Sequence, residues 1–386
     1  MKRSRSGYFV LLCILIAGTY FLLTPAFAHI PVFEGGGKSP ETATHVENPE
    51  KSRVLYGQLS EENIHYYSFE VEKGGERILL GFIVPAGLEG RIYVPEVDIT
   101  GAEFFTPDLI LMGPGLSSEG EVPENTKIPE GYGVKVFPGK RTGSAIYEGF
   151  SPSAFYSLAL EDFQAPESGT YYAAVSSAVG EGNYGVVLGY RERFSLSEWL
   201  SIPLKQIKTY RWEGQSLPFI FLPLGITLAA GILVILHKKE AAAGFNPARW
   251  AGLFSGLFFL GTGFSLIFQM LYSLSRSSYS PEVIITVFLA LASSGFGVIA
   301  LVLSMKDERY GEKSTQKRLY FFVLGLAGLL FWAGWILALS LHLKRRSCPG
   351  KEKDETGTGD QREMNREREV TEKMIHRKYN LYDRIK

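Results

Sequence analysis

The sequence predicts a multi-domain membrane protein, in which an exported antiparallel β-sandwich of jelly-roll-like type precedes a four-helix transmembrane bundle. Three observations predict this fold class. The chain begins with a secretory pattern, continues through short β-rich runs separated by Gly/Pro turns, and then contains four uncharged apolar runs. Each run is long enough to cross about 30 Å of hydrocarbon. The predicted segments are a signal (1–28), the sandwich (29–191), an interfacial collar (192–218), the membrane helices (219–343) and a charged tail (344–386).

The first segment has the three parts of a secretory signal. Lys2, Arg3 and Arg5 form a basic start, Tyr8–Leu23 is apolar, and Ala26-Phe27-Ala28 is a small-residue cleavage site. An uncleaved signal anchor is the alternative. Both interpretations send the following domain across the membrane, so we expect a multi-pass protein of the cell membrane with an extracytoplasmic amino-terminal domain.

The second segment contains strand patterns with almost no helical periodicity. In the first strand, Tyr67, Phe69 and Val71 alternate with polar residues, as expected for a strand with one buried face. Gly180, Gly182 and Gly185 have dinucleotide-motif spacing, but a strand follows them, so we predict a hairpin turn. Many strands joined by Gly/Pro turns favour an antiparallel sandwich. The predicted strands are Ile64–Glu72, Arg77–Val84, Asp108–Met112, Gly133–Phe137, Thr170–Val175 and Tyr184–Tyr190.

Both ends of this region carry motifs of a known kind of domain. Tyr56-Gly57-Gln58-Leu59 and Tyr66–Val71 stand near its start, and Gly169–Val175 and Gly182–Val186 stand near its end. These motifs resemble pre-peptidase C-terminal (PPC-type) β-sandwich domains over roughly 42–86 and 165–190. The resemblance implies a secreted accessory or binding module that is not a catalyst. The Asp-x-Tyr motif usual at the start of these domains is absent, because Asn63, Ile64 and His65 precede the tyrosines here, and this weakens the case for a calcium site of the family type. The segment 87–164 resembles no family that we can name.

The collar, 192–218, has the pattern of an amphipathic helix at a membrane surface. Ser195 and Glu198 have capping-box spacing, and Pro203 is predicted to split the segment into two short helices. A plain linker is the alternative. Lys205, Lys208 and Arg211 lie away from the apolar face, and Trp199 and Trp212 suit the headgroup region.

The four predicted spans are Phe219–Leu236, Trp250–Tyr272, Val283–Met305 and Leu319–Leu341. Their first and third connecting loops hold eight basic residues, whereas the second holds only Arg276, so the first and third loops are predicted to be cytoplasmic. Four spans then place the tail outside, although the basic run Lys344–Arg346 favours the inside. Small residues four apart, such as Gly252 with Gly256 and Ser293 with Gly297, predict close helix packing.

Charge and motif content narrow the possible functions. Residues 29–218 hold 26 acidic and 15 basic side chains, a net charge of 15 − 26 = −11, so nucleic acid is not an expected partner. No catalytic motif is present, and we expect a protein that is not an enzyme. The spans contain no Asp, Glu, Lys or Arg, and Gln269 is their most polar interior residue. That disfavours an ion-coupled transporter.

Two metal sites can be considered from the residue types. Cleavage after Ala28 would make His29 the first residue, and its amine and imidazole, with His45 or His65, could form a copper-binding histidine brace. Glu96, Asp98 and Glu103 could hold Ca²⁺ on a loop, or form a solvated acidic turn.

Three functions are therefore considered. The first is a non-catalytic β-sandwich that binds a small ligand or protein partner, or serves as an accessory subunit of a membrane complex, with the lipid bilayer as a further partner and no cofactor. The second is a copper-binding membrane protein that uses His29. The third is a small-solute transporter with an external receptor domain.

Overall fold

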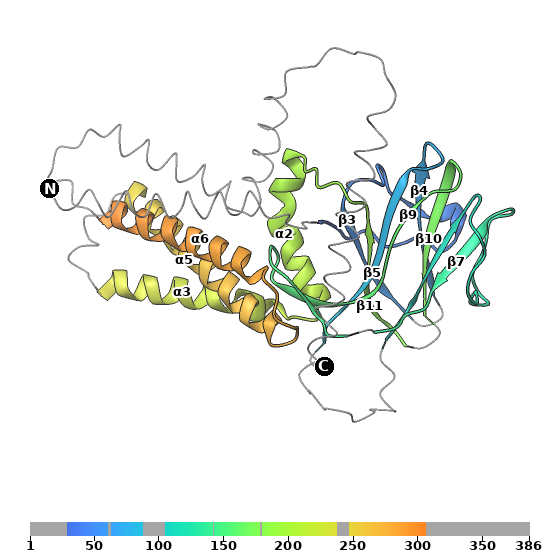
Figure 1. The fold of residues 1–386 in the computed structure, drawn as a ribbon. Helices are drawn as coiled ribbons and strands as arrows, with labels where there is room; N and C mark the ends of the chain where they lie inside the picture. The colour runs from blue at the N-terminus through green and yellow to red at the C-terminus, as the bar shows by residue number, and fades with distance from the viewer. Residues whose placement is uncertain are drawn as a thin grey trace, which may run out of the picture. The chain divides into compact units, whose positions relative to one another are not determined.

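The computed structural model describes residues 29–60, 63–87, 105–141, 143–177, 180–237 and 247–305 (Figure 1). The predicted signal, the fourth predicted span and the tail lie outside these residues. The strands are β1 (Ile30–Val32), β2 (Thr44–His45), β3 (Arg53–Leu59), β4 (Ile64–Val71), β5 (Arg77–Pro85), β6 (Asp108–Gly113), β7 (Gly133–Phe137), β8 (Ile146–Glu148), β9 (Ser153–Gln164), β10 (Gly169–Ser176) and β11 (Gly182–Leu188). The helices are α2 (Leu196–Trp212), α3 (Leu217–His237), α5 (Pro247–Leu274) and α6 (Val283–Met305), with a short 3-10 turn, η1, at Pro40–Thr42.

The strands form two mixed sheets, which we call the β domain. One sheet has the order β1-β3-β11-β5-β9-β8 and the other β2-β4-β10-β6-β7. The prediction of purely antiparallel sheets is wrong at two edges, where β1 pairs in parallel with β3 and β2 with β4. The chain between the partners of each parallel pair is long enough for the crossover that parallel pairing needs.

The six predicted strands are present as β4, β5, β6, β7, β10 and β11. The predicted hairpin after residue 180 is wrong, because β10 and β11 belong to different sheets. Gly180 has a positive φ of 74°, so it does mark a turn, but this turn carries the chain from one sheet to the other.

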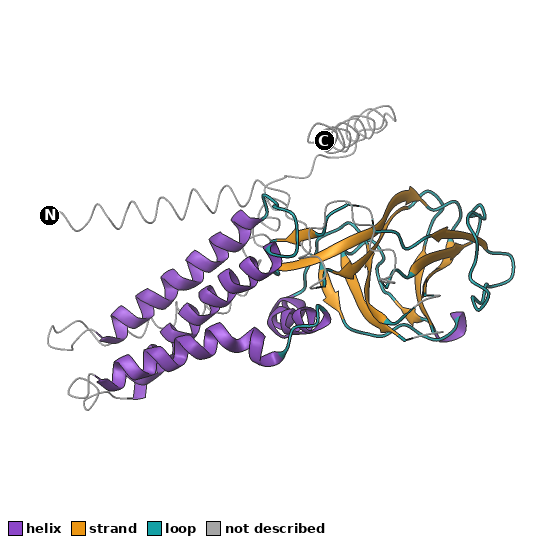
Figure 2. Cartoon of the chain, turned by 90° about the horizontal axis from the view of Figure 1, so that it is seen from below, coloured by secondary structure: helices purple, strands orange, loops and turns teal. Residues whose placement is uncertain are grey.

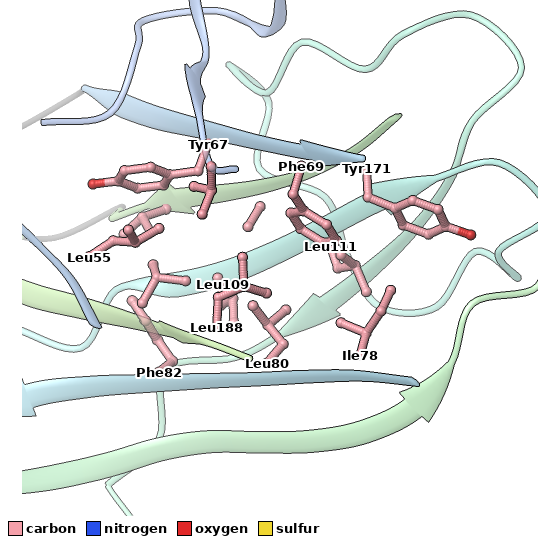
Figure 3. Close-up of a cluster of buried hydrophobic side chains, with 14 of the residues drawn as sticks. Leu55, Tyr67, Phe69, Ile78, Leu80, Phe82, Leu109, Leu111, Tyr171 and Leu188 are labelled. Atoms are coloured by element: carbon pink, nitrogen blue, oxygen red, sulfur yellow. The ribbon is translucent and has the colours of Figure 1, made fainter. Parts of the chain in front are cut away.

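One apolar cluster lies between the two sheets (Figure 3). Tyr67 and Phe69 of β4 face Leu80 and Phe82 of β5, and all four side chains are almost completely buried. Tyr67, Phe69 and Val71 share this core, as their alternation predicts. The opposite face of β4 is also covered, since Ile64 and Tyr66 belong to a second cluster with β6 and β7.

The collar is a single helix, α2, that continues through Pro203, so the predicted division into two helices is wrong. The cap at Ser195 is present as predicted: its hydroxyl accepts the Glu198 N–H, and Glu198 reaches back to the Ser195 N–H. Glu198 also pairs with Lys51 of the β domain at 2.6 Å. We attribute the helix's tolerance of Pro203 to this anchored first turn and to a last turn buried through Tyr210 and Trp212.

Three helices are long and apolar enough to cross a membrane, and Figure 2 shows them as purple ribbons. Their apolar segments are Leu217–His237, Gly252–Leu274 and Val283–Val302. By length and composition, the chain is therefore a membrane protein.

Small residues bring α5 and α6 together. A Cβ on Gly297 would lie 2.8 Å from the Gly256 carbonyl oxygen, and Ser293 donates to the Phe259 carbonyl at 2.8 Å. This confirms the predicted close packing for these two helices. Gly225 of α3, by contrast, has open space where its Cβ would be.

Candidate functional site

The structure does not gather the three histidines proposed for copper. His29 bonds to Ser52, His45 to Ser68, and His65 to the Tyr184 hydroxyl. Burial lowers the pKa of His29 to about 4, so its imidazole is neutral. Among the described residues, no three His, Cys, Asp or Glu side chains form a group that could hold a metal. Copper binding through His29 stays a prediction that depends on signal cleavage, and Glu96, Asp98 and Glu103 lie outside the described residues.

His65, which is half-buried, instead belongs to a hydrogen-bonded set that extends into the core. The Tyr184 hydroxyl lies 2.7 Å from His65 Nδ1 and 2.8 Å from the Tyr67 hydroxyl. Gly57 makes this arrangement possible, because a Cβ there would lie 2.4 Å from the Tyr184 ring. These contacts join the two sheets at one end of the core.

The first candidate site is a polar joint between the β domain and the helices, formed by Glu213, Gln215, Gln269 and Arg276. Glu213 follows α2 and Arg276 follows α5, and their charged groups meet at 3.1 Å with side-chain exposures of 0% and 1%. Two buried charges are tolerated only when they are paired and hydrogen-bonded.

Both charged groups of the joint have further partners. Arg276 Nη1 donates to the Ala86 carbonyl at 2.6 Å, and Glu213 Oε1 accepts the Ala154 N–H at 2.6 Å. Ala86 and Ala154 both belong to the β domain. Burial raises the pKa of Glu213, while Arg276 and the Ala154 N–H act in the opposite direction.

The two glutamines extend the joint into α5. The Gln215 amide donates to Glu213 at 2.9 Å and to Gln269 at 3.0 Å, and Gln269 donates back to Gln215 at 2.9 Å. This reciprocal pair gives the most polar residue of the predicted spans a structural role.

The start of α6 makes a second set of contacts with the β domain. The Tyr147 hydroxyl of β8 and the Thr286 hydroxyl of α6 are bonded, and Thr286 also donates to the Gly149 carbonyl. Glu148 accepts the N–H groups of Phe150 and Ser151 at 2.8 and 2.7 Å. Burial, together with the nearby carboxylates of Glu282 and Glu213, raises the pKa of Glu148 to about 8.

The second candidate site is a pocket of about 550 Å³ between α2 and the β domain, which we call the α2 pocket. Phe33, Tyr56 and Trp212 form its aromatic wall, in which Phe33 stacks on Tyr56 at 4.9 Å and Tyr56 meets Trp212 edge-on at 4.8 Å. The Trp212 indole N–H donates to the Tyr184 carbonyl at 3.0 Å, which fixes the ring.

The polar side of the α2 pocket carries positive charge. Lys208 and Arg211 lie one turn apart on α2 and are exposed, and Lys208 Nζ stands 5.6 Å from the centre of the Phe33 ring. Arg211 donates to the Gln215 carbonyl at 3.0 Å. The remaining polar lining comes from two amide side chains, Gln58 and Asn183.

Sequence reasoning did not identify either site. The basic residues of α2 were recognised as a separate face, which is the signal that could have indicated the pocket. The joint had a weaker signal: Arg276 was noted only as the single basic residue of its loop, and Gln269 only as the most polar residue of a span.

Comparison with known proteins assigns no family. No family model matches the chain, and no curated protein matches it. Among solved structures, the chain is similar to Salmonella Typhimurium PliG, a periplasmic lysozyme inhibitor of g-type lysozyme. That match covers 39% of this chain and all of PliG, at 15% identity and a TM-score of 0.20, and at this level it carries no argument about fold or function.

Proposed function

We propose that this chain is an integral membrane protein that holds an extracytoplasmic β-sandwich in one orientation on its membrane helices, where the sandwich binds a ligand or partner without catalysis. The same proposal includes that the sandwich is of the PPC type and that the membrane helices form a four-helix bundle. The single observation that carries it is the buried contact between Arg276 and Glu213.

This contact bears on orientation as well as on rigidity. Arg276 is the only basic residue of the second connecting loop, and it lies against the β domain, as does the neighbouring Ser278, whose N–H donates to the Ala145 carbonyl. The second loop and the β domain therefore share one side of the helices. Because the first and third loops carry the basic residues, the positive-inside rule favours the cytoplasm for them and the exterior for the β domain.

Cysteine labelling in intact cells tests this topology. In a chain whose Cys13 and Cys348 are replaced by serine, we expect Lys73→Cys in the β domain and Ser278→Cys in the second loop to react with a membrane-impermeant maleimide. Lys239→Cys, in the first loop, should react only after permeabilisation. The reverse pattern would overturn the proposed orientation.

The polar joint also bears on the transport alternative. Gln269 is the most polar interior residue of the predicted spans and therefore the group that we nominate for a solute path, and its amide is bonded to Gln215. Gln269→Leu should therefore weaken the attachment of the β domain, which limited proteolysis can measure. Uptake by the reconstituted chain that is abolished by Gln269→Leu, with an unchanged proteolysis pattern, would favour transport instead.

A further inference from the structure

The α2 pocket differs in charge from the domain that surrounds it. Residues 29–218 carry a net charge of −11, yet the described residues that line the pocket include two cations and no acidic side chain. Within the described part of the chain, neither Lys208 nor Arg211 forms an ion pair. Two exposed cations one helical turn apart, neither of them held in an ion pair among these residues, attract an anion.

Other residues that line the same pocket suit an apolar group. Phe33, Tyr56 and Trp212 are held by mutual ring contacts, and the Trp212 ring is also fixed by its bond to Tyr184. The Asn183 amide donates to the Trp212 carbonyl at 2.6 Å, which fixes the backbone at this wall. Binding pockets of this size commonly combine apolar walls with a few well-placed polar groups.

The pocket also lies close to the start of a candidate span. Trp212 is its last lining residue in the sequence, and the apolar helix α3 begins five residues later at Leu217. Lipid phosphate groups lie at the membrane surface, next to the residues at which a membrane-spanning helix begins or ends.

We propose that the α2 pocket binds a phosphate-bearing amphiphile, with the phosphate on Lys208 and Arg211 and the apolar part on the aromatic wall. This proposal names a ligand class for the binding function proposed above. The binding geometry does not depend on which side of the membrane the β domain occupies, so the labelling experiment and the binding experiment can fail independently.

The test uses the full chain purified in an uncharged detergent, with binding measured by calorimetry. The probes are dihexanoyl-phosphatidylglycerol, dihexanoyl-phosphatidylcholine and inorganic phosphate. We expect saturable binding of the anionic lipid. Lys208→Gln with Arg211→Gln should weaken this binding at least about tenfold, because each cation supplies a charged hydrogen bond. Because Arg211 also donates to the Gln215 carbonyl and Lys208 lies over the Phe33 ring, we expect a small fall in melting temperature, and thermal unfolding of the double variant checks that it is folded in the binding assay.

A matched control distinguishes the effect of the pocket's cations from the effect of the chain's overall charge. Lys73→Gln removes an exposed cation from the turn between β4 and β5 and should leave the affinity unchanged. Phe33→Ala should weaken the lipid but not inorganic phosphate, because only the lipid uses the aromatic wall.

The arms of the experiment distinguish the sources of the phosphate group. Stronger binding of the anionic lipid than of the zwitterionic one indicates a lipid headgroup. Binding of inorganic phosphate alone, abolished by the double substitution, indicates a soluble phosphate ligand and overturns the role of the aromatic wall. No binding of any probe, or lipid binding that survives the double substitution, would overturn the proposal as a whole.

Discussion

Replacing Arg276 with methionine removes the positive charge of the polar joint while keeping much of the side chain's length. The Glu213 carboxylate then stays fully buried with two N–H donors, from Ala154 and Gln215, and without its counter-ion. The Ala86 carbonyl also loses the 2.6 Å bond from Arg276. Removing one partner of a buried ion pair costs about 3–5 kcal/mol, because the remaining charge is uncompensated.

Removing both charges should cost much less. In the chain with Arg276→Met and Glu213→Gln, the glutamine carbonyl can still accept the Ala154 N–H, and no charge is buried. Replacing buried ion pairs by uncharged groups is often neutral or stabilising. We therefore expect the double substitution to recover most of the stability that Arg276→Met loses.

Thermal unfolding of the detergent-purified chain, followed by near-ultraviolet circular dichroism, measures these effects. For a unit of 150–250 residues, 3–5 kcal/mol corresponds to a fall in Tm of about 6–20 °C. Arg77→Met is the matched control, because Arg77 pairs with Asp162 at 2.8 Å while both side chains are 46% and 44% exposed. Exposed pairs contribute at most about 1 kcal/mol. If Arg276→Met lowers the Tm no more than Arg77→Met does, the joint does not hold the domain as we infer.

Three further predictions follow from other parts of the structure. The pKa of Glu148 is raised from 4.5 to about 8, so between these pH values the folded state holds the proton more tightly than the unfolded state does. The free energy of unfolding should therefore fall as the pH rises from 4.5 to about 8, by at most about 1.4 kcal/mol per pH unit. Glu148→Gln should flatten this fall in denaturant titrations at several pH values. Gly297→Ala should destabilise α5–α6 packing by about 1–3 kcal/mol, because its Cβ would meet the Gly256 carbonyl at 2.8 Å, and this should lower the Tm. Ser195→Ala should cost about 1 kcal/mol through loss of the α2 cap, measured as a lower Tm.

Two of these predictions have a control variant within the chain, and the third has an outcome that would contradict it. Gly225→Ala meets open space and should be tolerated, so equal losses at Gly225 and Gly297 would contradict the packing argument. Ser195→Asp should retain most of the stability that alanine loses, since aspartate also caps helices. A pH dependence that Glu148→Gln leaves unchanged would show that another group titrates in the window.

Most of the regular structure could be predicted from the sequence. Strands that bury one or both faces carry a clear pattern of apolar residues, and most strands of this chain do so. The longest strand was missed for a physical reason. β9 spans Ser153–Gln164 and contains no β-branched residue. Six of its twelve residues are Ala, Leu, Glu or Asp, and only its three aromatic residues favour a strand, so the local preference is weak. It forms a strand because β5 and β8 pair with its two edges. β3 was recognised only by motif, since Gly57 interrupts its pattern.

The candidate sites could be predicted less well than the fold. The joint is formed by residues far apart in the sequence, and one of its members, Arg276, looks like an ordinary loop cation until its burial is known. The α2 pocket depends on Asn183 and Tyr56 meeting the basic face of a helix that follows them in the chain. Neither set of contacts can be inferred from the spacing of residues within a single segment.

The joint's polarity has a consequence that an apolar contact would lack. Hydrophobic contact is not directional. Paired donors and acceptors, by contrast, are satisfied at one relative position, and each buried group left unpaired costs about 1–3 kcal/mol. Trp212 lines the α2 pocket, and the next residue, Glu213, bonds to Arg276 at the end of α5. Two consecutive residues therefore fix both the aromatic wall of the pocket and its position relative to the membrane helices. The position of the pocket relative to the helices is then set by these hydrogen bonds rather than by the length of a flexible linker.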